Sequence, residues 1–186
     1  MPDLHNVETP DFSVTGQATV VEIEPREFES QEIRDVLAVW NERRGMHAMP
    51  TREDVLPRPL GRLLRNVSLV KVIDGGADYE FRIVGDVHVQ AYGVNSQGTR
   101  ISALIASPAW SQFGNILQRS YDLVRLRRAP VGFRGFIRRE VAQARFDWAE
   151  TLYMPLRNAA GEVEYILNAS VYRPRDGIWR GKHVLG

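Results

Sequence analysis

Three strand patterns follow one another closely at the end of the chain, and they limit the possible folds more than any other feature. They run over residues 131–138, 145–156 and 163–172. The short segment 158–162 between the last two has the composition of a hairpin connection. We therefore expect these strands to pair antiparallel in one sheet.

A further pair of strands precedes them. Residues 67–73 form the first strand, and Tyr79, Phe81 and Ile83 alternate along the second. The segment 74–78 between them reads DGGAD, which suits a hairpin. With the three later strands, this pair predicts a five-stranded antiparallel sheet.

Two amphipathic helices are predicted outside the strands. The first spans residues 30–44, where apolar side chains recur at helical spacing. They form one stripe, which consists of Ile33, Val36, Leu37 and Trp40. The second helix spans residues 108–128 and ends in arginines, which favour a helix C-terminus. Shorter helical turns are expected over residues 59–64 and 86–92.

The order of these elements predicts an α+β fold, in which the five-stranded antiparallel sheet has its helices on one side and an N-terminal amphipathic helix precedes it. We divide the chain into an N-terminal arm (1–29), the N-terminal helix with its connector (30–64), the sheet-containing core (65–173) and a C-terminal tail (174–186). The arm contains one short apolar run, residues 18–23, that suggests a strand.

Composition excludes several functional classes. The 186 residues contain no cysteine, which rules out disulfides, thiolate metal sites, iron–sulfur clusters, Cys nucleophiles and cysteinyl–flavin photoadducts. The 24 basic and 23 acidic residues leave a formal charge of +1, which argues against a general nucleic-acid or membrane-surface binder. No window approaches the ~18 apolar residues of a membrane span, so we expect a cytoplasmic protein.

No catalytic or metal site is expected. The histidines lie far apart, and none has a second His or an acid at metal-ligand spacing: His5, His47, His88 and His183. Asp147 and Glu150 fall on opposite faces of their strand, so they cannot form a close carboxylate pair. We therefore expect a protein that is not an enzyme.

Glu150 is the most interesting acid, because alternation places it on the same face as Phe146 and Leu152. If that face is core, the charge needs a partner such as Arg82 or Arg134, since an unpaired buried charge is costly. The alternative is an exposed sheet edge.

The most concentrated positive patch lies at the end of the second helix, at Arg125, Arg127 and Arg128. Such charges stabilise a helix C-terminus without any ligand. An anion site for a nucleotide or an acidic partner is the alternative, since arginine suits phosphate and carboxylate recognition.

Several short segments carry a resemblance to a known family. They are Trp40 with Arg44-Gly45, Met49-Pro50-Thr51-Arg52, Leu69 to Val72, Tyr79 to Gly85, Gly93 to Ile105 with Gly98, and Leu152 to Leu156 with Gly161. Together they resemble a PAS domain, and specifically a bacterial family of short proteins that consist of little more than one PAS domain. The resemblance covers about residues 32–172. Asp86 and Leu56 depart from the family pattern.

The resemblance implies a sensory or protein-interaction module that places a small ligand between the sheet and its helices. The residues expected around such a pocket are Phe81, Ile83, Tyr92, Phe113, Leu117, Tyr121, Phe133, Glu150 and Leu167. Haem-binding PAS domains would place a histidine on the long helix, and residues 108–128 contain none. We therefore expect no cofactor.

PAS domains often pair through the N-terminal helix, which implies a homodimer formed by the stripe of Ile33, Val36, Leu37 and Trp40. Folding of that stripe onto its own sheet is the alternative. The sequence thus predicts a cytoplasmic sensory protein that acts on an unknown signalling partner, and whose pocket ligand controls that contact. A small enzyme with Tyr92, Tyr121 and Glu150 in its pocket, and a nucleotide-binding module that uses arginines, are the alternatives.

Overall fold

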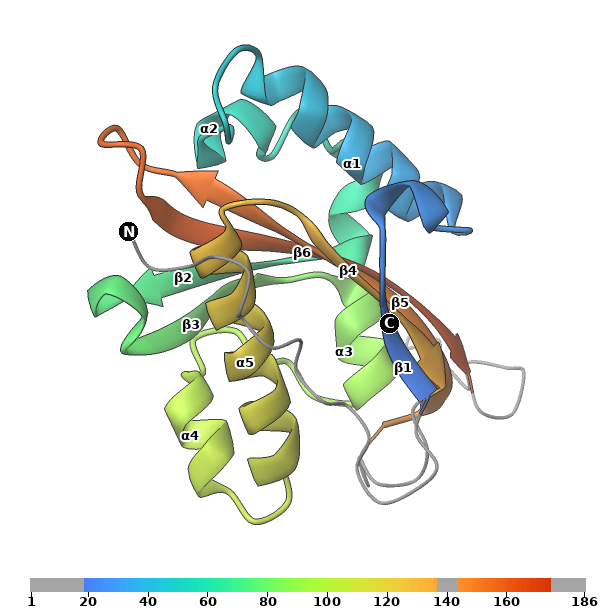
Figure 1. Ribbon diagram of the computed structural model, residues 1–186. Coiled ribbons are helices and arrows are strands. Elements are labelled where there is room, and N and C mark those ends of the chain that lie inside the picture. Colours follow the sequence, from blue (N-terminus) through green and yellow to red (C-terminus); the bar gives the residue numbers. More distant parts are fainter. Residues whose placement is uncertain (1–18, 137–143, 175–186) are drawn as a thin grey trace, which may run out of the picture.

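A computed structural model describes residues 19–136 and 144–174 (Figure 1). The strands are β1 (Thr19–Ile23), β2 (Val67–Ile73), β3 (Asp78–Val84), β4 (Val131–Phe136), β5 (Phe146–Arg157) and β6 (Val163–Pro174). The α-helices are α1 (Gln31–Arg44), α2 (Arg52–Val55), α3 (Asp86–Tyr92), α4 (Ile101–Ala106) and α5 (Ser111–Arg127). Three short 3-10 helices are η2 (Pro25–Glu27), η3 (Gly61–Asn66) and η4 (Asp74–Gly76).

The strands form one antiparallel sheet in the order β1-β4-β5-β6-β2-β3. The α+β class and the antiparallel pairing are confirmed, but the sheet has six strands where we expected five. The additional strand is β1, which pairs with β4 from Thr19↔Phe136 to Ile23↔Gly132. It is the short apolar run of the N-terminal arm, and it extends the sheet beyond β4.

Helices cover both faces of the sheet, not one. In Figure 1, α1 and α2 lie over one face, whereas α4 and α5 lie across the other. We call these the α1 face and the α5 face. Alternation along each strand separates the two: Leu152 and Met154 of β5 pack under α1, while Tyr153 between them belongs to the cluster around Leu117 of α5.

The apolar stripe of α1 packs on its own sheet. Ile33 and Val36 are fully buried there, and Trp40 is 3% exposed. The indole Nε1 of Trp40 donates a hydrogen bond of 3.0 Å to the carbonyl oxygen of Pro155 in β5. Leu37 is half-buried beside them. The expectation that this stripe pairs with a second copy is therefore wrong, because these side chains already form the intramolecular core.

Glu150 holds the start of α1 against the sheet. Its carboxylate is fully buried and accepts hydrogen bonds from the backbone N–H groups of Glu29 (3.0 Å) and Ser30 (2.9 Å) and from the Ser30 hydroxyl. The guanidinium of Arg134, directly opposite on β4, lies 3.5 Å away. Of the two arginines that we considered, Arg134 is thus the partner, while Arg82 pairs with Glu80 on β3.

The long helix begins later than we expected and is preceded by α4, which we did not predict. Ser107 follows the last residue of α4, and α5 begins at Ser111 after Trp110. The two helices pack closely at Gly114, where a Cβ atom would lie 2.9 Å from the backbone nitrogen of Ile105. A glycine at this point allows α4 to lie against α5.

Replacement of Glu150 by glutamine should destabilise the fold by about 2 kcal/mol, because hydrogen bonds to a buried charged group contribute roughly 1.5 to 3 kcal/mol. Urea unfolding measures the change. As a control, Glu162→Gln removes a 70% exposed carboxylate that pairs with Arg128, and it should stay within about 0.5 kcal/mol of wild type. Equal effects of the two substitutions would contradict the role of Glu150.

Val36→Glu should abolish cooperative unfolding or cost at least about 3 kcal/mol, because it places an unpaired charge in the core under α1. Ala38→Glu on the exposed side of the same helix should be tolerated. Urea unfolding and light scattering measure both variants. A well-folded, monomeric Val36→Glu protein obtained from a dimeric wild type would contradict the intramolecular packing.

Candidate functional site

A cavity of about 120 Å³ lies on the α5 face, between the central strands and helices α3, α4 and α5. Five residues that we expected around a pocket do line it: Phe81, Tyr92, Phe113, Leu117 and Tyr121. Phe133 lies on the same face and packs against Tyr153, with ring centroids 6.0 Å apart, but it does not reach the cavity. The other three lie on the α1 face.

Ile83 is displaced by a β-bulge. Leu69 pairs with Ile83 and the next residue, Val70, pairs with Phe81, so Arg82 is an extra residue on β3. Because an extra residue reverses the alternation, Phe81 faces the cavity while Ile83 packs under α1. The expectation that Ile83 lines the pocket is therefore wrong.

Glu150 and Leu167 follow the expected alternation, but the face that carries them is the α1 face. Leu167 is fully buried beneath α1, and Glu150 binds the start of that helix. Neither lines the cavity, so the expectation that Glu150 and Leu167 surround the pocket is wrong. The acid–base pocket of the alternative enzyme hypothesis also loses its carboxylate.

The polar side of the cavity comes from residues that we did not single out as pocket residues. They are Ser68, His88, Ser96, Thr99, Thr151, Asn168 and Tyr172. In β5 and β6 these polar residues alternate with the apolar residues of the α1 face, and such a pattern indicates a solvent-facing side. These residues can be recognised as pocket residues only when helices are known to cover both faces of the sheet, because the second layer makes the polar face interior.

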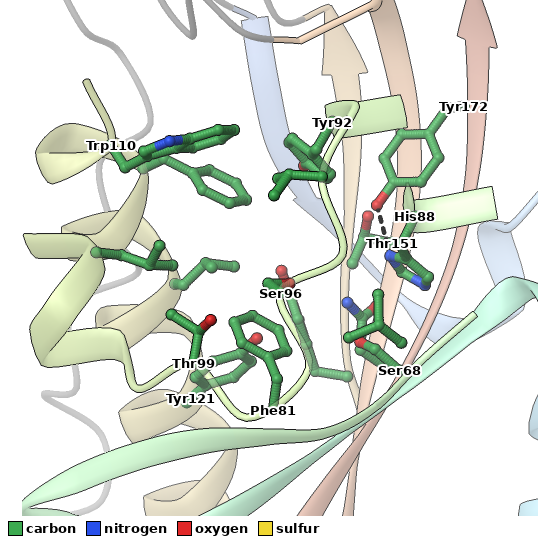
Figure 2. Close-up of a pocket in the computed structure, with 17 residues that line it drawn as sticks. Ser68, Phe81, His88, Tyr92, Ser96, Thr99, Trp110, Tyr121, Thr151 and Tyr172 are labelled. Atoms are coloured by element: carbon green, nitrogen blue, oxygen red, sulfur yellow. Dashed lines mark hydrogen bonds between the residues drawn. The ribbon is translucent and has the colours of Figure 1, made fainter. Parts of the chain in front are cut away.

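Aromatic rings enclose the cavity at two ends. Figure 2 shows Trp110 and Tyr92 at one end and Phe81 and Tyr121 at the other. The ring centroids of Tyr92 and Phe113 are 4.8 Å apart, and those of Trp110 and Phe113 are 6.0 Å apart. These two ends of the cavity are therefore aromatic.

His88 and Tyr172 form a buried hydrogen-bonded pair at the sheet side (Figure 2). The Nε2 atom of His88 lies 3.1 Å from the carbonyl oxygen of Asn66 and must donate, because a carbonyl can only accept. In a neutral ring, Nδ1 then accepts from the Tyr172 hydroxyl, 3.0 Å away. Burial lowers the pKa of His88 to about 4, so the ring is neutral near pH 7.

A second polar chain crosses between β5 and β6. The Ser170 hydroxyl donates to Oδ1 of Asn168 at 2.9 Å. Because this uses the only hydrogen of Ser170, the Thr151 hydroxyl, 3.0 Å away, is the donor of their mutual hydrogen bond. The hydroxyl hydrogens of Thr151 and Ser170 are thus already engaged within the protein.

Two buried hydroxyls are left without a partner among the described residues, those of Ser68 and Tyr121. Ser68 comes from β2 and is 1% exposed, while Tyr121 comes from α5 and is fully buried. Both side chains line the cavity. Nearly all buried polar groups in proteins are hydrogen-bonded, and either an ordered water or a bound small molecule can supply the partner of these two hydroxyls.

The cavity is lined by aromatic, aliphatic and neutral polar side chains. Among the described residues that line it, none is an Asp, Glu, Lys or Arg. Burial raises the pKa of Tyr172 to about 12 and that of Tyr121 well above its ordinary value, so these hydroxyls stay protonated near pH 7. Both nitrogens of His88 are occupied by hydrogen bonds. The lining thus provides polar contacts but no free general base.

Two searches of the described residues, for a metal-ligand cluster and for a membrane-spanning helix, found neither. Within 19–136 and 144–174, no three His, Cys, Asp or Glu side chains are grouped to hold a metal ion. In the same ranges, no helix has both the length and the apolar character needed to span a bilayer. His5 and His183 lie outside the described residues.

Comparison with known proteins gives the family. A family model described as "PAS domain" matches residues 28–170, from just before α1 into β6. The chain belongs to the PAS domain family. The resemblance that we identified in the sequence is thereby confirmed, and the cavity of this PAS domain lies where that resemblance placed a ligand, between the sheet and the long helix. A search of curated proteins found no match.

One solved structure similar to this PAS domain is described as an RNA-binding light-oxygen-voltage receptor. It shares 15% sequence identity, and the TM-score is 0.42 over 85% of this chain. The PAS domain spans 39% of the length of that receptor chain.

The buried His88 should make this PAS domain less stable in acid. The unfolded imidazole binds a proton below about pH 6.5, whereas the folded one does so only near pH 4. Its stabilising contribution is therefore complete above pH 6.5 and is lost as the pH falls toward 4.

Urea unfolding at pH 7 and pH 4.5 tests this expectation. Between these two values, wild type should lose about 2 kcal/mol more than His88→Gln, which cannot titrate. The exposed His47, changed to glutamine, is the matched control and should keep the wild-type pH dependence. Parallel profiles of wild type and His88→Gln would contradict the buried neutral state.

Proposed function

We propose that this PAS domain is a sensory module that binds a small molecule in the cavity on its α5 face and does not convert it chemically. The observation that carries the proposal is the pair of buried hydroxyls, Ser68 and Tyr121, which line the cavity without a partner among the described residues. Aromatic walls and neutral polar groups around them suit recognition of a ligand.

The signal is passed on through contact with another protein in the cytoplasm, either a second copy or a signalling partner. Membership of the PAS domain family supports this part of the proposal. The stripe of Ile33, Val36 and Trp40 is used within the chain. A homodimer would therefore form through another surface.

The nucleotide-binding alternative has less support. No arginine lines the cavity among the described residues. The arginines at the end of α5 pair with acids of the same chain: Arg125 with Asp122, Arg127 with Glu22 and Arg128 with Glu162. These contacts favour the interpretation that the patch stabilises the helix end and its surroundings.

Native mass spectrometry after incubation with a cell metabolite extract tests ligand binding. Wild type should gain the mass of one small molecule per chain. Ser96→Trp should lose it, because Ser96 is half-exposed and lines the cavity, so that a large ring there obstructs the space. Gln97→Trp, at an exposed neighbour that does not line the cavity, should retain it.

The same spectra report whether the protein carries one or two chains. The absence of any adduct on wild type, or identical adducts on wild type and Ser96→Trp, would contradict a ligand in this cavity.

A further inference from the structure

The dimensions and lining of the cavity restrict what it can bind. This inference rests on the proposed function, because it concerns the ligand of the same cavity. We propose that the ligand is a small, uncharged, planar ring that carries polar atoms on two sides and exchanges hydrogen bonds with Ser68 and Tyr121.

The absence of charge follows from the lining. Among the described residues around the cavity, no side chain of Asp, Glu, Lys or Arg can balance a charge on the ligand. His88 lies at the sheet side, and the hydrogen bonds to Asn66 and Tyr172 use both of its nitrogens. A charged group would lose its hydration without gaining an ionic partner, which is costly.

The size follows from the volume. A cavity of about 120 Å³ exceeds the space of one water molecule, which needs roughly 10 to 15 Å³ on such a scale. An engineered protein cavity of roughly 150 Å³ holds benzene. Pockets for drug-sized ligands are larger, at about 300 to 1,000 Å³. One ring with small substituents therefore fits this space better than a flavin or a haem.

The planar shape follows from the walls. Tyr92 and Trp110 at one end, and Phe81 at the other, bring aromatic rings to the cavity (Figure 2). Aromatic rings pack favourably against other rings in stacked or edge-to-face arrangements. A flat ligand can contact both ends at once.

The two polar positions follow from the unpaired hydroxyls. Ser68 lies on β2 and Tyr121 on α5, so the two groups approach the cavity from different elements. The neighbouring hydroxyls of Thr151 and Tyr172 already have partners within the protein. Each free hydroxyl can both donate and accept. A ligand with a polar atom at each end satisfies both.

A matched pair of probes tests the inference on the protein of residues 1–186. At pH 7, 4-hydroxybenzamide is neutral, whereas 4-hydroxybenzoate has nearly the same shape and carries a negative charge. Titrations followed by calorimetry and by two-dimensional amide NMR should show that the amide binds, with shifts near Ser68 and Tyr121. The carboxylate should bind at least tenfold more weakly.

Removal of each hydroxyl should weaken binding of 4-hydroxybenzamide by about tenfold, which corresponds to the loss of about 1.4 kcal/mol. The variants are Ser68→Ala and Tyr121→Phe. Tyr165→Phe removes a hydroxyl on the α1 side of the sheet and should leave the affinity unchanged. Without probe, Ser68→Ala should unfold at a temperature no lower than wild type, because it breaks no hydrogen bond to a described residue.

Three results would overturn the inference. Equal binding of the two probes would show that charge is accepted, although the cavity would still be a ligand site. Unchanged affinity in both hydroxyl variants would remove the assigned contacts. Binding of neither probe, with an adduct from the metabolite extract that Ser96→Trp abolishes, would show that the ligand class is wrong while the proposed function stands. If the extract also gives no adduct, both the inferred ligand class and the proposed function fail.

Discussion

The hydrogen bonds between Glu150 and the start of α1 are the interaction on which the rest of the structure depends. A fully buried carboxylate on β5 is stable only because the backbone N–H groups of Glu29 and Ser30 and the guanidinium of Arg134 surround it. These contacts fix the first turn of α1 over the sheet. The apolar stripe that follows then covers the α1 face, so the sheet becomes interior on both sides.

This arrangement gives a single strand two functions. Adjacent residues of β5 point to opposite faces, so Glu150 binds the start of α1 while Thr151 lines the cavity. The α1 face carries the larger aliphatic residues and supports the fold. The α5 face can therefore accommodate polar side chains and a cavity, because much of the apolar burial is supplied elsewhere.

The mainly aromatic part of the site could be predicted from the sequence, whereas its polar side could not, and the errors have specific physical causes. Phe81, Tyr92, Phe113, Leu117 and Tyr121 line the cavity as expected. The prediction that Ile83 lines the pocket was wrong, because a β-bulge at Arg82 reverses the alternation. No residue type in that strand marks the bulge. The prediction that Leu167 lines the pocket was wrong for another reason. Alternation shows which residues share a face of the sheet, but not which helices cover that face.

The sequence by itself determined the antiparallel α+β order, the five later strands and the two long helices near their observed limits, the PAS family and the exclusion of every cysteine-dependent chemistry. Apart from the family, which a resemblance of short sequence segments indicates, these properties are local, because they depend on periodicity, turn residues and composition. Only the tertiary structure decided that β1 joins the sheet, that α1 folds onto its own chain and that Ser68 and Tyr121 meet one cavity. Each of these requires contacts between residues far apart in the chain, whose partners no local pattern encodes.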